Sequence, residues 1–307
     1  MSYRPSWSRI LSQTGKPLAL FFVVSLVVTS IYELGFRFRV FSVPDLPLSL
    51  LGSALGIFLG FRTNSAYGRW WEARQLWGAL VNQSRTWTRQ IISFSEAAGG
   101  RSPSGPDPEI VAWQKRMVYT QIAFAHALRY HLRGENPLRP LDAFLDPDRL
   151  DFLRDHKNVP AALLHMMGKE VTRAADTNWF GEMRLLALNQ TLTELTNIQG
   201  GCERIRNTPL PRQYDYYPEL FLNGYCFLLP LALVPDLGYL TPVLTLLIGF
   251  VLIVLNRIGK NLEDPFDSPV YGIPMVSLST TIEIDLRQQL GEDALPTPIR
   301  PEQGVLR

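Results

Sequence analysis

Residues 46–77 constrain the fold most strongly, because one uninterrupted segment changes from apolar to charged and aromatic. Its first half, 46–61, carries no charge, whereas its second half carries three arginines and one glutamate among three tryptophans and a tyrosine. Trp and Tyr favour the headgroup level of a bilayer, where the ring has one wet edge and one apolar edge. No proline or glycine cluster interrupts the change, so the segment predicts one long helix that crosses a membrane and continues into the cytoplasm.

Three glycines recur every four residues in the apolar half of this helix. Gly52, Gly56 and Gly60 therefore form one stripe along it. Such stripes let helix backbones approach closely in lipid. We expect the stripe to serve helix packing between several copies of the chain.

The adjacent stripe contains Ser53, Ile57 and Phe61, again four residues apart. If several copies pack through the glycines, this neighbouring stripe faces a shared axis. Rings of Ile57 and Phe61 on that axis would form a hydrophobic constriction, a place where channels can gate by dewetting. The alternative is that both are ordinary packing residues of a transmembrane helix, since periodicity does not say what a stripe faces.

Four segments are apolar enough, and close enough to the roughly 20 residues needed, to predict transmembrane helices. They cover 18–36, 46–62, 219–235 and 238–256. The chain then divides into four parts. These are 1–62 with the first two membrane helices, a cytoplasmic helical insert at 63–215, the last two membrane helices at 216–257, and a cytoplasmic tail at 258–307.

Basic residues predict the orientation of the predicted membrane helices, since cytoplasmic flanks are enriched in Lys and Arg. Basic residues precede the first helix and follow the second and fourth, which makes this a multi-pass protein with both termini in the cytoplasm. Arg37 and Arg39, in the outer loop, are the exceptions.

The insert reads as helical throughout, and no strand-like alternation longer than a few residues occurs. Amphipathic helices are predicted at 75–96, 110–133, 160–177 and 178–200, with short helical pieces in 138–157, a loop at 98–108 and a further helical piece near 278–290 in the tail. The expected fold is therefore all-α. We expect the tail to dock on a neighbour or to stay loose.

Several function classes lack their sequence signatures. The net charge of +2 comes without a basic stripe of interleaved aromatics, so no nucleic-acid partner is expected. Cys202 and Cys226 have no metal-ligand spacing and are read as reduced thiols. The histidines lack metal spacing, and no phosphate loop or nucleophile elbow occurs, so neither an enzyme, a metal nor a cofactor is predicted.

A secondary transporter is the remaining alternative to a channel. Transporters commonly combine inverted repeats with helices broken at mid-membrane. Pro230 and Pro242 could mark such breaks, but the first two membrane helices have no counterpart. A channel is therefore the better reading.

Residues 60–78 resemble the bestrophin family, and its bacterial members closely. The likeness rests on the Gly60-Phe61 pair followed by Arg69-Trp70-Trp71. Further matching stretches are GGCERIRNTPLPRQY at 200–214, NGYCFLLPLALV at 223–234 and NLEDPFD at 261–267. The resemblance extends over roughly residues 5 to 290.

The resemblance implies a homopentameric ion channel in the inner membrane of a bacterium. Five copies of the second helix would surround the pore, with Ser53, Ile57 and Phe61 lining its neck. Ser53 departs from the apolar residue that the family has there, so the outer end of the neck would be shorter or wider. The interface and vestibule would carry Arg62, Arg69, Trp70, Trp71 and Glu72.

The family also implies a second restriction, formed by an apolar residue before the Gly-Gly-Cys-Glu motif. Leu192, Leu195 and Ile198 are the candidates. Leu192 is favoured, and helix packing is the alternative for each.

Calcium opens the animal members of the family through acidic residues just after the fourth helix. Here Glu263, Asp264 and Asp267 are interrupted by prolines and do not resemble a calcium site, which needs roughly six to eight converging oxygens. We predict no calcium gating, and expect Glu263 and Asp264 to pair with arginines of a neighbouring helix or to cap one.

The permeant ion is expected to be monovalent, with chloride first and cations such as sodium as the alternative. Arg62 favours anions if it faces the lumen, because charges that flank an apolar neck bias ion choice. Glu72 and Arg74 are expected to neutralise each other or to pair between subunits.

Overall fold

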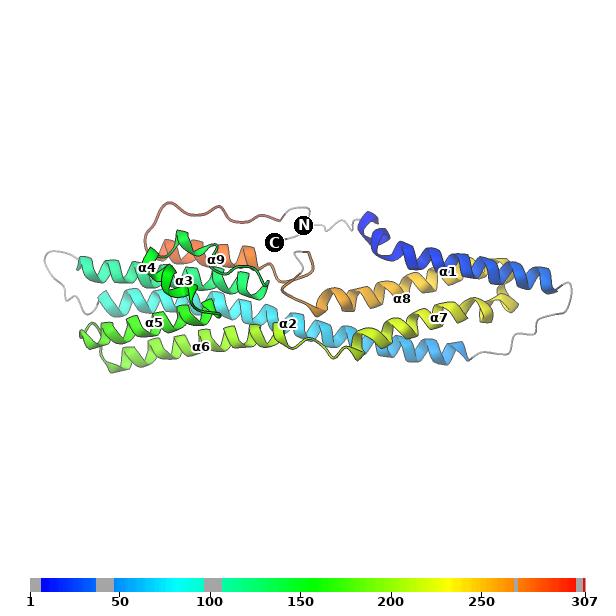
Figure 1. Cartoon of the computed structure of the whole chain (residues 1–307), viewed down its shortest axis with the longest axis horizontal. Helices are drawn as coiled ribbons and strands as arrows, with labels where there is room; N and C mark the ends of the chain where they lie inside the picture. Colours follow the sequence, from blue (N-terminus) through cyan, green and yellow to red (C-terminus); the bar gives the residue numbers. More distant parts are fainter. Residues whose placement is uncertain (1–6, 37–46, 97–106, 268–269, 302–305, 307) are drawn as a thin grey trace. The chain divides into compact units, whose positions relative to one another are not determined.

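The computed structural model describes residues 7–36, 47–96, 107–267, 270–301 and 306, and all regular structure within them is helical (Figure 1). The all-α prediction is thus confirmed for this part of the chain. The chain forms two compact units. Unit 1 comprises residues 1–70 and 209–264, and unit 2 comprises 71–208 and 265–307. Most of the predicted loop at 98–108, together with Arg37 and Arg39, lies outside the described residues.

Helix α2 (Leu48–Glu96) is a single helix of 49 residues that contributes to both units. It joins the long helix predicted within 46–77 to the amphipathic helix predicted at 75–96. At 1.5 Å per residue it is about 70 Å long, more than twice the hydrocarbon thickness of a bilayer. One helix can therefore begin in a membrane and end well outside it.

Unit 1 contains α1 (Trp7–Phe36), the first part of α2, α7 (Gln213–Leu237) and α8 (Thr241–Glu263). The helix predicted at 18–36 thus begins earlier, at Trp7, and continues through Pro17. A short 3₁₀ turn, η2 (Gly238–Leu240), joins α7 to α8. Gly238 has a φ of +49°, a backbone conformation in which glycine is favoured, and so lets the chain reverse.

The apolar contacts inside unit 1 are few relative to its apolar surface. Its core contains Phe21, Leu55, Leu59, Leu222, Cys226 and Ile253. Large apolar side chains remain exposed on α1 and α8, including Leu20, Val23, Val27, Leu34, Val243 and Leu247. Exposed apolar surface of this extent marks contact with a membrane or a partner.

Two segments of the described chain are apolar and long enough to cross a membrane: Thr14–Gly35, and Gln213–Glu263, which contains both α7 and α8. Only 17% and 28% of their most apolar windows are buried, which distinguishes them from core helices of a water-soluble domain. The predicted span at 46–62 does not meet this test. Its apolar part ends at Phe61, so this crossing remains a prediction.

Unit 2 packs helices around the second part of α2. They are α3 (Pro108–Leu132), α4 (Pro147–Arg154), α5 (Val159–Asp176), α6 (Glu182–Asn207) and α9 (Met275–Gln289), with a 3₁₀ turn η1 (Leu141–Ala143). The caps explain two of the starts: Asp107 accepts a hydrogen bond from the N–H of Glu109, and Asn158 from that of Ala161. The predicted helices agree with these bounds, except that α6 continues past Gly200 and Gly201 to Asn207.

Helix α9, the predicted helical piece of the tail, packs on α3 of its own chain. Arg129 Nη1 donates to Ser279 Oγ at 2.9 Å, and His126 Nε2 lies 3.0 Å from Glu283 Oε2. The expectation that the tail docks on a neighbour or stays loose is therefore wrong for this helix. A sequence pattern shows an amphipathic face but not which surface covers it.

Candidate functional site

The predicted neck residues share one face of α2, and this face is uncovered in the single chain. Ile57 is 61% exposed and Phe61 is 65% exposed, and Ser53 is exposed as well. The Ser53 hydroxyl donates to the carbonyl of Ser49 at 2.8 Å, so its hydrogen is already used in a bond within the helix. The stripe is therefore available to a shared axis, and its place in a pore remains a proposal.

The opposite face of α2 is buried in unit 1. Leu55 and Leu59 belong to the core, and Arg62 lies on the same side because it follows them at i+7 and i+3. Arg62 is only 1% exposed. Phe61 and Arg62 are neighbours in sequence but point to different sides of the helix.

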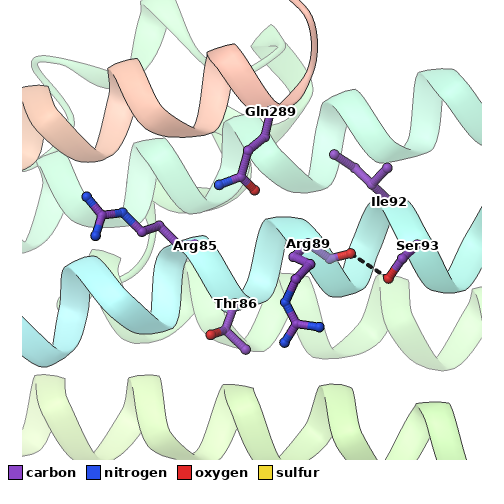
Figure 2. Close-up of a pocket in the computed structure, with 6 residues that line it drawn as sticks. All are labelled: Arg85, Thr86, Arg89, Ile92, Ser93 and Gln289. Carbon is purple, nitrogen blue, oxygen red and sulfur yellow. Dashed lines mark hydrogen bonds between the residues drawn. The ribbon is translucent and has the colours of Figure 1, made fainter.

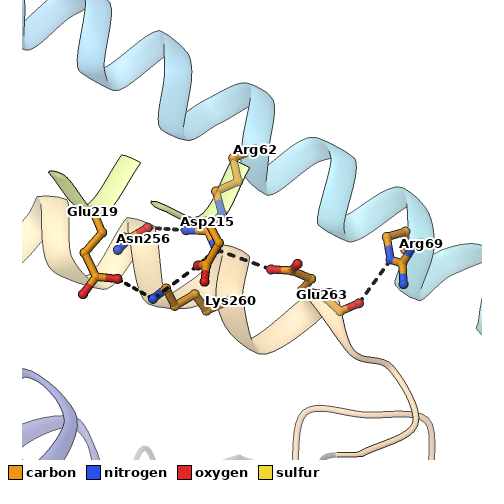
Figure 3. Close-up of polar contacts among 7 residues, drawn as sticks. All are labelled: Arg62, Arg69, Asp215, Glu219, Asn256, Lys260 and Glu263. Atoms are coloured by element: carbon orange, nitrogen blue, oxygen red, sulfur yellow. Dashed lines mark hydrogen bonds and ion pairs between the residues drawn. The ribbon is translucent and has the colours of Figure 1, made fainter. Parts of the chain in front are cut away.

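Three polar side chains surround the Arg62 guanidinium (Figure 3). Its Nη1 donates to Asn256 Oδ1 at 2.5 Å, and its Nη2 lies 2.7 Å from Asp215 Oδ1 and 3.4 Å from Glu263 Oε2. These partners come from α7 and α8, so one side chain ties α2 to both helices. Burying an arginine is costly unless its charge is paired and its N–H groups are bonded. Nε is the one donor atom left without a partner.

Two further cations complete this cluster. Lys260 Nζ lies 2.5 Å from Glu219 Oε2 and 3.3 Å from Asp215 Oδ1. Arg69 Nε donates to the backbone carbonyl of Glu263 at 3.2 Å, which adds a contact between α2 and the end of α8 (Figure 3). With Arg62, these form a cluster of three cations and three carboxylates.

The condition under which Arg62 would favour anions, a side chain that faces the lumen, is not met in the single chain. Its side chain is buried between helices, and its charge is neutralised within the chain. The signal was present in the sequence, since a residue three positions after a core leucine shares its face. The predicted pairing of Glu263 with an arginine of a neighbouring helix is confirmed, and Asp264 is the C-terminal cap residue of α8.

The three glycines of the stripe have different surroundings. A Cβ on Gly52 would lie 2.7 Å from the hydroxyl oxygen of Tyr225, so this glycine allows α7 to approach within the same chain. At Gly56 and Gly60 an added Cβ would meet no described atom within 4 Å. Both line an open groove of about 520 Å³ in unit 1, together with Leu255 and Ile258 of α8. The packing prediction between copies thus stays a proposal for Gly56 and Gly60, and Gly52 packs inside the chain.

The aromatic residues after the neck stripe have different surroundings. Trp70, in unit 1, is half-buried and stacks on Tyr67 with ring centroids 6.2 Å apart. Trp71, in unit 2, is exposed. Glu72 is paired with Arg204 of α6 rather than with Arg74, so the expected Glu72–Arg74 neutralisation is wrong. Spacing along one helix favours local pairs, whereas the partner here comes from another helix.

The proposed cytoplasmic restriction is not supported by burial. Leu192 is 8% exposed and packs towards Gly168 of α5, and Leu195 and Ile198 are buried as well. In the single chain all three residues contribute to helix packing, and Leu192 also lines an open groove, so the restriction at Leu192 stays a prediction. Leu186, on α6, is 62% exposed and is an apolar residue that sequence reasoning overlooked. Its position six residues before Leu192 places it on a different face of the helix.

Both cysteines are free and buried, in agreement with the prediction of reduced thiols. Burial, with smaller contributions from the neighbouring Glu203 and Glu72 carboxylates, raises the pKa of the Cys202 thiol to about 12. A thiol of this kind is a poor nucleophile at neutral pH.

Two of the three acidic residues at the end of α8 and just after it pair with arginines of the chain. Glu263 pairs with Arg62 in unit 1, and Asp267 lies 2.8 Å from Arg206 in unit 2. Within the described residues, no group of three or more His, Cys, Asp or Glu side chains is arranged to hold a metal ion.

A helical unit whose apolar helices stay largely exposed, and a second all-helical unit, point to the class of helical membrane proteins. The chain matches the family described as Bacterial/Fungal Bestrophin protein over residues 4–288, and it belongs to that family. It is similar to the voltage-dependent anion channel-forming protein YneE of Salmonella typhimurium, with 33% identity over 298 residues covering 96% of this chain and 92% of the relative. The protein RSc3414 of Ralstonia nicotianae, which carries the same description, is 32% identical over 93% of this chain and 90% of its own length.

Solved structures agree with this assignment. A crystal structure of a bacterial bestrophin homolog from Klebsiella pneumoniae aligns with a TM-score of 0.82 and 28% identity, covering 91% of this chain and 98% of that one. The similarity therefore includes the helices of both units. The resemblance read from residues 60–78 and the three further stretches is confirmed at the level of the family.

Proposed function

We propose that the chain forms an ion channel in the bacterial inner membrane that passes small monovalent anions, with chloride as the first candidate. Five copies would place the Ser53, Ile57 and Phe61 face of α2 around a common axis. The observation that carries the proposal is the division of α2 into an exposed apolar face and a buried face whose only charge is neutralised. The large apolar side chains of Ile57 and Phe61 are uncovered, and the neighbouring Arg62 holds this part of α2 against α7 and α8. This arrangement suits a pore neck.

Assembly is supported by the open groove at Gly56 and Gly60, which the side chains of a neighbouring copy could fill. Four membrane helices in one chain enclose no axis, so the channel needs several copies. In mild detergent the protein should have about five times the chain mass of 34.8 kDa. Light scattering that gives a monomer or a dimer would reject the pore.

Anion preference is supported by the names of the relatives, which are called anion channel-forming proteins. The buried and neutralised Arg62 does not supply that preference, and an apolar neck by itself selects weakly by charge. The experiment is the reversal potential in a planar bilayer with asymmetric NaCl. A potential near the chloride equilibrium value supports the proposal, and one near the sodium value replaces anions by cations such as sodium.

The alternative is a secondary transporter of small ions or solutes. Replacing chloride by gluconate should abolish the current of an anion channel. Raising the chloride concentration at moderate salt should increase that current without saturation. Uphill uptake into vesicles, driven by a second ion gradient, would decide for a transporter.

Calcium is not proposed as an opener, because the carboxylates of Glu263 and Asp267 are held by arginines. Currents should be the same in micromolar calcium and in excess chelator. A reversible loss of current on chelation would contradict this.

A further inference from the structure

Unit 2 contains an open groove that the channel proposal does not use (Figure 2). It lies beside the second part of α2 and the last residue of α9, and its volume is about 420 Å³. Its lining residues are Arg85, Thr86, Arg89, Ile92, Ser93 and Gln289. Two guanidinium groups from one helix therefore border the same space, four residues apart.

Arg85 is held in place by α9. Its Nε donates to Asp285 Oδ2 at 2.8 Å, and its Nη2 lies 2.6 Å from the same oxygen. This pair fixes the C-terminal part of α9 beside α2 and brings Gln289 to the groove. Asp285 also balances the charge of Arg85. Arg85 therefore forms part of the groove wall but adds little net positive charge to it.

Arg89 supplies the uncompensated charge. Its side chain is exposed, and its guanidinium has no hydrogen-bond or ion-pair partner in the described part of the chain. Arg62, Arg85 and Arg204 each have a carboxylate partner, so this state distinguishes Arg89 from them.

The neutral residues around Arg89 add donors. The side chains of Thr86 and Gln289 also bond to none of the residues that the structure describes. Ser93 is different, because its hydroxyl donates to the carbonyl of Arg89 at 2.7 Å and has no proton left (Figure 2). The groove thus offers a guanidinium, an amide N–H₂ and one hydroxyl to a ligand.

Unused donors around an uncompensated cation favour a ligand rich in acceptor oxygens. The planar guanidinium presents parallel N–H groups that match the oxygens of phosphate or carboxylate. The C-terminal end of α9 carries a partial negative charge that opposes an anion. Its last carbonyls, however, already accept bonds from the N–H groups of Leu290, Gly291 and Glu292.

We propose that this groove is a binding site for a small oxyanion of the phosphate class, recognised by Arg89 with help from Gln289 and Thr86. Binding of an oxyanion here does not require ion flow, so this proposal can be tested independently of the channel proposal.

The test is isothermal titration of inorganic phosphate into the full-length protein in detergent at low ionic strength. Phosphate should bind the parent, and Arg89→Gln should weaken binding by about tenfold or more, because a charge-assisted bond is lost. Arg89→Lys should fall between the two, since it keeps the charge but not the planar pair of donors. Arg139→Gln is the matched control, because Arg139 is exposed in the same unit and lies outside the groove.

Three outcomes overturn the proposal. The parent binds no phosphate, Arg89→Gln binds as tightly as the parent, or chloride at equal ionic strength displaces phosphate as well as phosphate itself does. Light scattering of the same samples separates a further possibility. If Arg89→Gln lowers the oligomer mass, the groove holds a neighbouring copy and the oxyanion site is rejected.

Discussion

Unit 1 and unit 2 differ in how much apolar side-chain surface they leave exposed. Unit 1 leaves leucines and valines of α1 and α8 exposed, and it buries the charged Arg62. Unit 2 buries Trp77 and Trp87 completely and keeps most of its arginines at the surface. The two units of one chain thus distribute apolar and charged side chains differently between interior and surface.

The difference reflects the surroundings that each unit is built for. In lipid, apolar side chains gain little by facing inward, so helices are held by close packing and by polar contacts between them. In water, apolar burial is the main stabilising term. Arg62 in unit 1 and Trp87 in unit 2 are each almost fully buried, and each bonds α2 to another helix of its unit.

The largest effect is expected at Trp87. The ring is fully buried, and its Nε1 donates to the carbonyl of Met117 at 3.4 Å. Trp87→Ala should destabilise unit 2 by about 3–5 kcal/mol, since it leaves a large cavity. Thermal unfolding of the purified protein, followed by circular dichroism, measures this change. Trp71→Ala, at an exposed tryptophan of the same helix, is the control and should shift the midpoint little.

The second effect is expected at Arg62. Arg62→Ala removes the common partner of Asn256, Asp215 and Glu263, and should destabilise unit 1 by about 3 kcal/mol. Half of the Asp215 side chain is exposed, so water compensates part of its loss. Arg62→Lys should recover stability only in part, because one ammonium cannot reach three acceptors as the fork does.

The thermal midpoint in detergent, with Lys16→Ala as the control, provides the measurement. An unchanged midpoint in Arg62→Ala would show that the cluster contributes no stability and that apolar packing alone stabilises unit 1.

The third prediction separates the two stripes of α2. Ile57→Ala combined with Phe61→Ala should raise single-channel conductance several-fold and weaken gating, because an apolar wall that makes ions shed water is removed. Assembly should be retained, because packing between copies is assigned to Gly56 and Gly60 and not to this stripe. Gly56→Leu should instead fill the open groove and reduce the oligomer.

Size and current of these variants are compared in the same preparation. If the double alanine variant conducts like the parent while Gly56→Leu assembles normally, the roles of the two stripes are reversed.

The smallest effect concerns the end of α9. Burial tends to raise the pKa of Glu292, but hydrogen bonds from Arg287 and Tyr119 outweigh it and the pKa is lowered. A lowered pKa in the folded state means that this carboxylate stabilises the tail above its ordinary value of 4.5 and loses that effect as pH falls below it.

Limited proteolysis near residue 292 at pH 7 and pH 4 should show the tail loosening in acid. Glu292→Gln should loosen it by less than about 1 kcal/mol at pH 7 and show a smaller pH response than the parent. Asp293→Gln is a control one residue away, at an exposed position. Equal pH responses in the parent and in Glu292→Gln would contradict the assignment.

Sequence alone determined the features that rest on local pattern. The uninterrupted run at 46–77 predicted one helix across the change from apolar to charged residues, and helical periods predicted the rest of α2 at 75–96. The same periods predicted α3, α5 and α9 within a few residues. The Gly60-Phe61 and Arg69-Trp70-Trp71 motifs predicted the family. These features depend on neighbours in the chain, which a sequence shows directly.

Tertiary structure decided which side chain meets which. It placed Arg62 in the interior with Asp215 and Glu263 and paired Glu72 with Arg204. It buried Leu192 against α5 and left Arg89 beside an open groove. The physical reason is that helical periodicity fixes the direction of a side chain relative to its own helix only. Its environment is set by other helices, which for the ion pairs of Arg62 and Glu72 come from more than a hundred residues away.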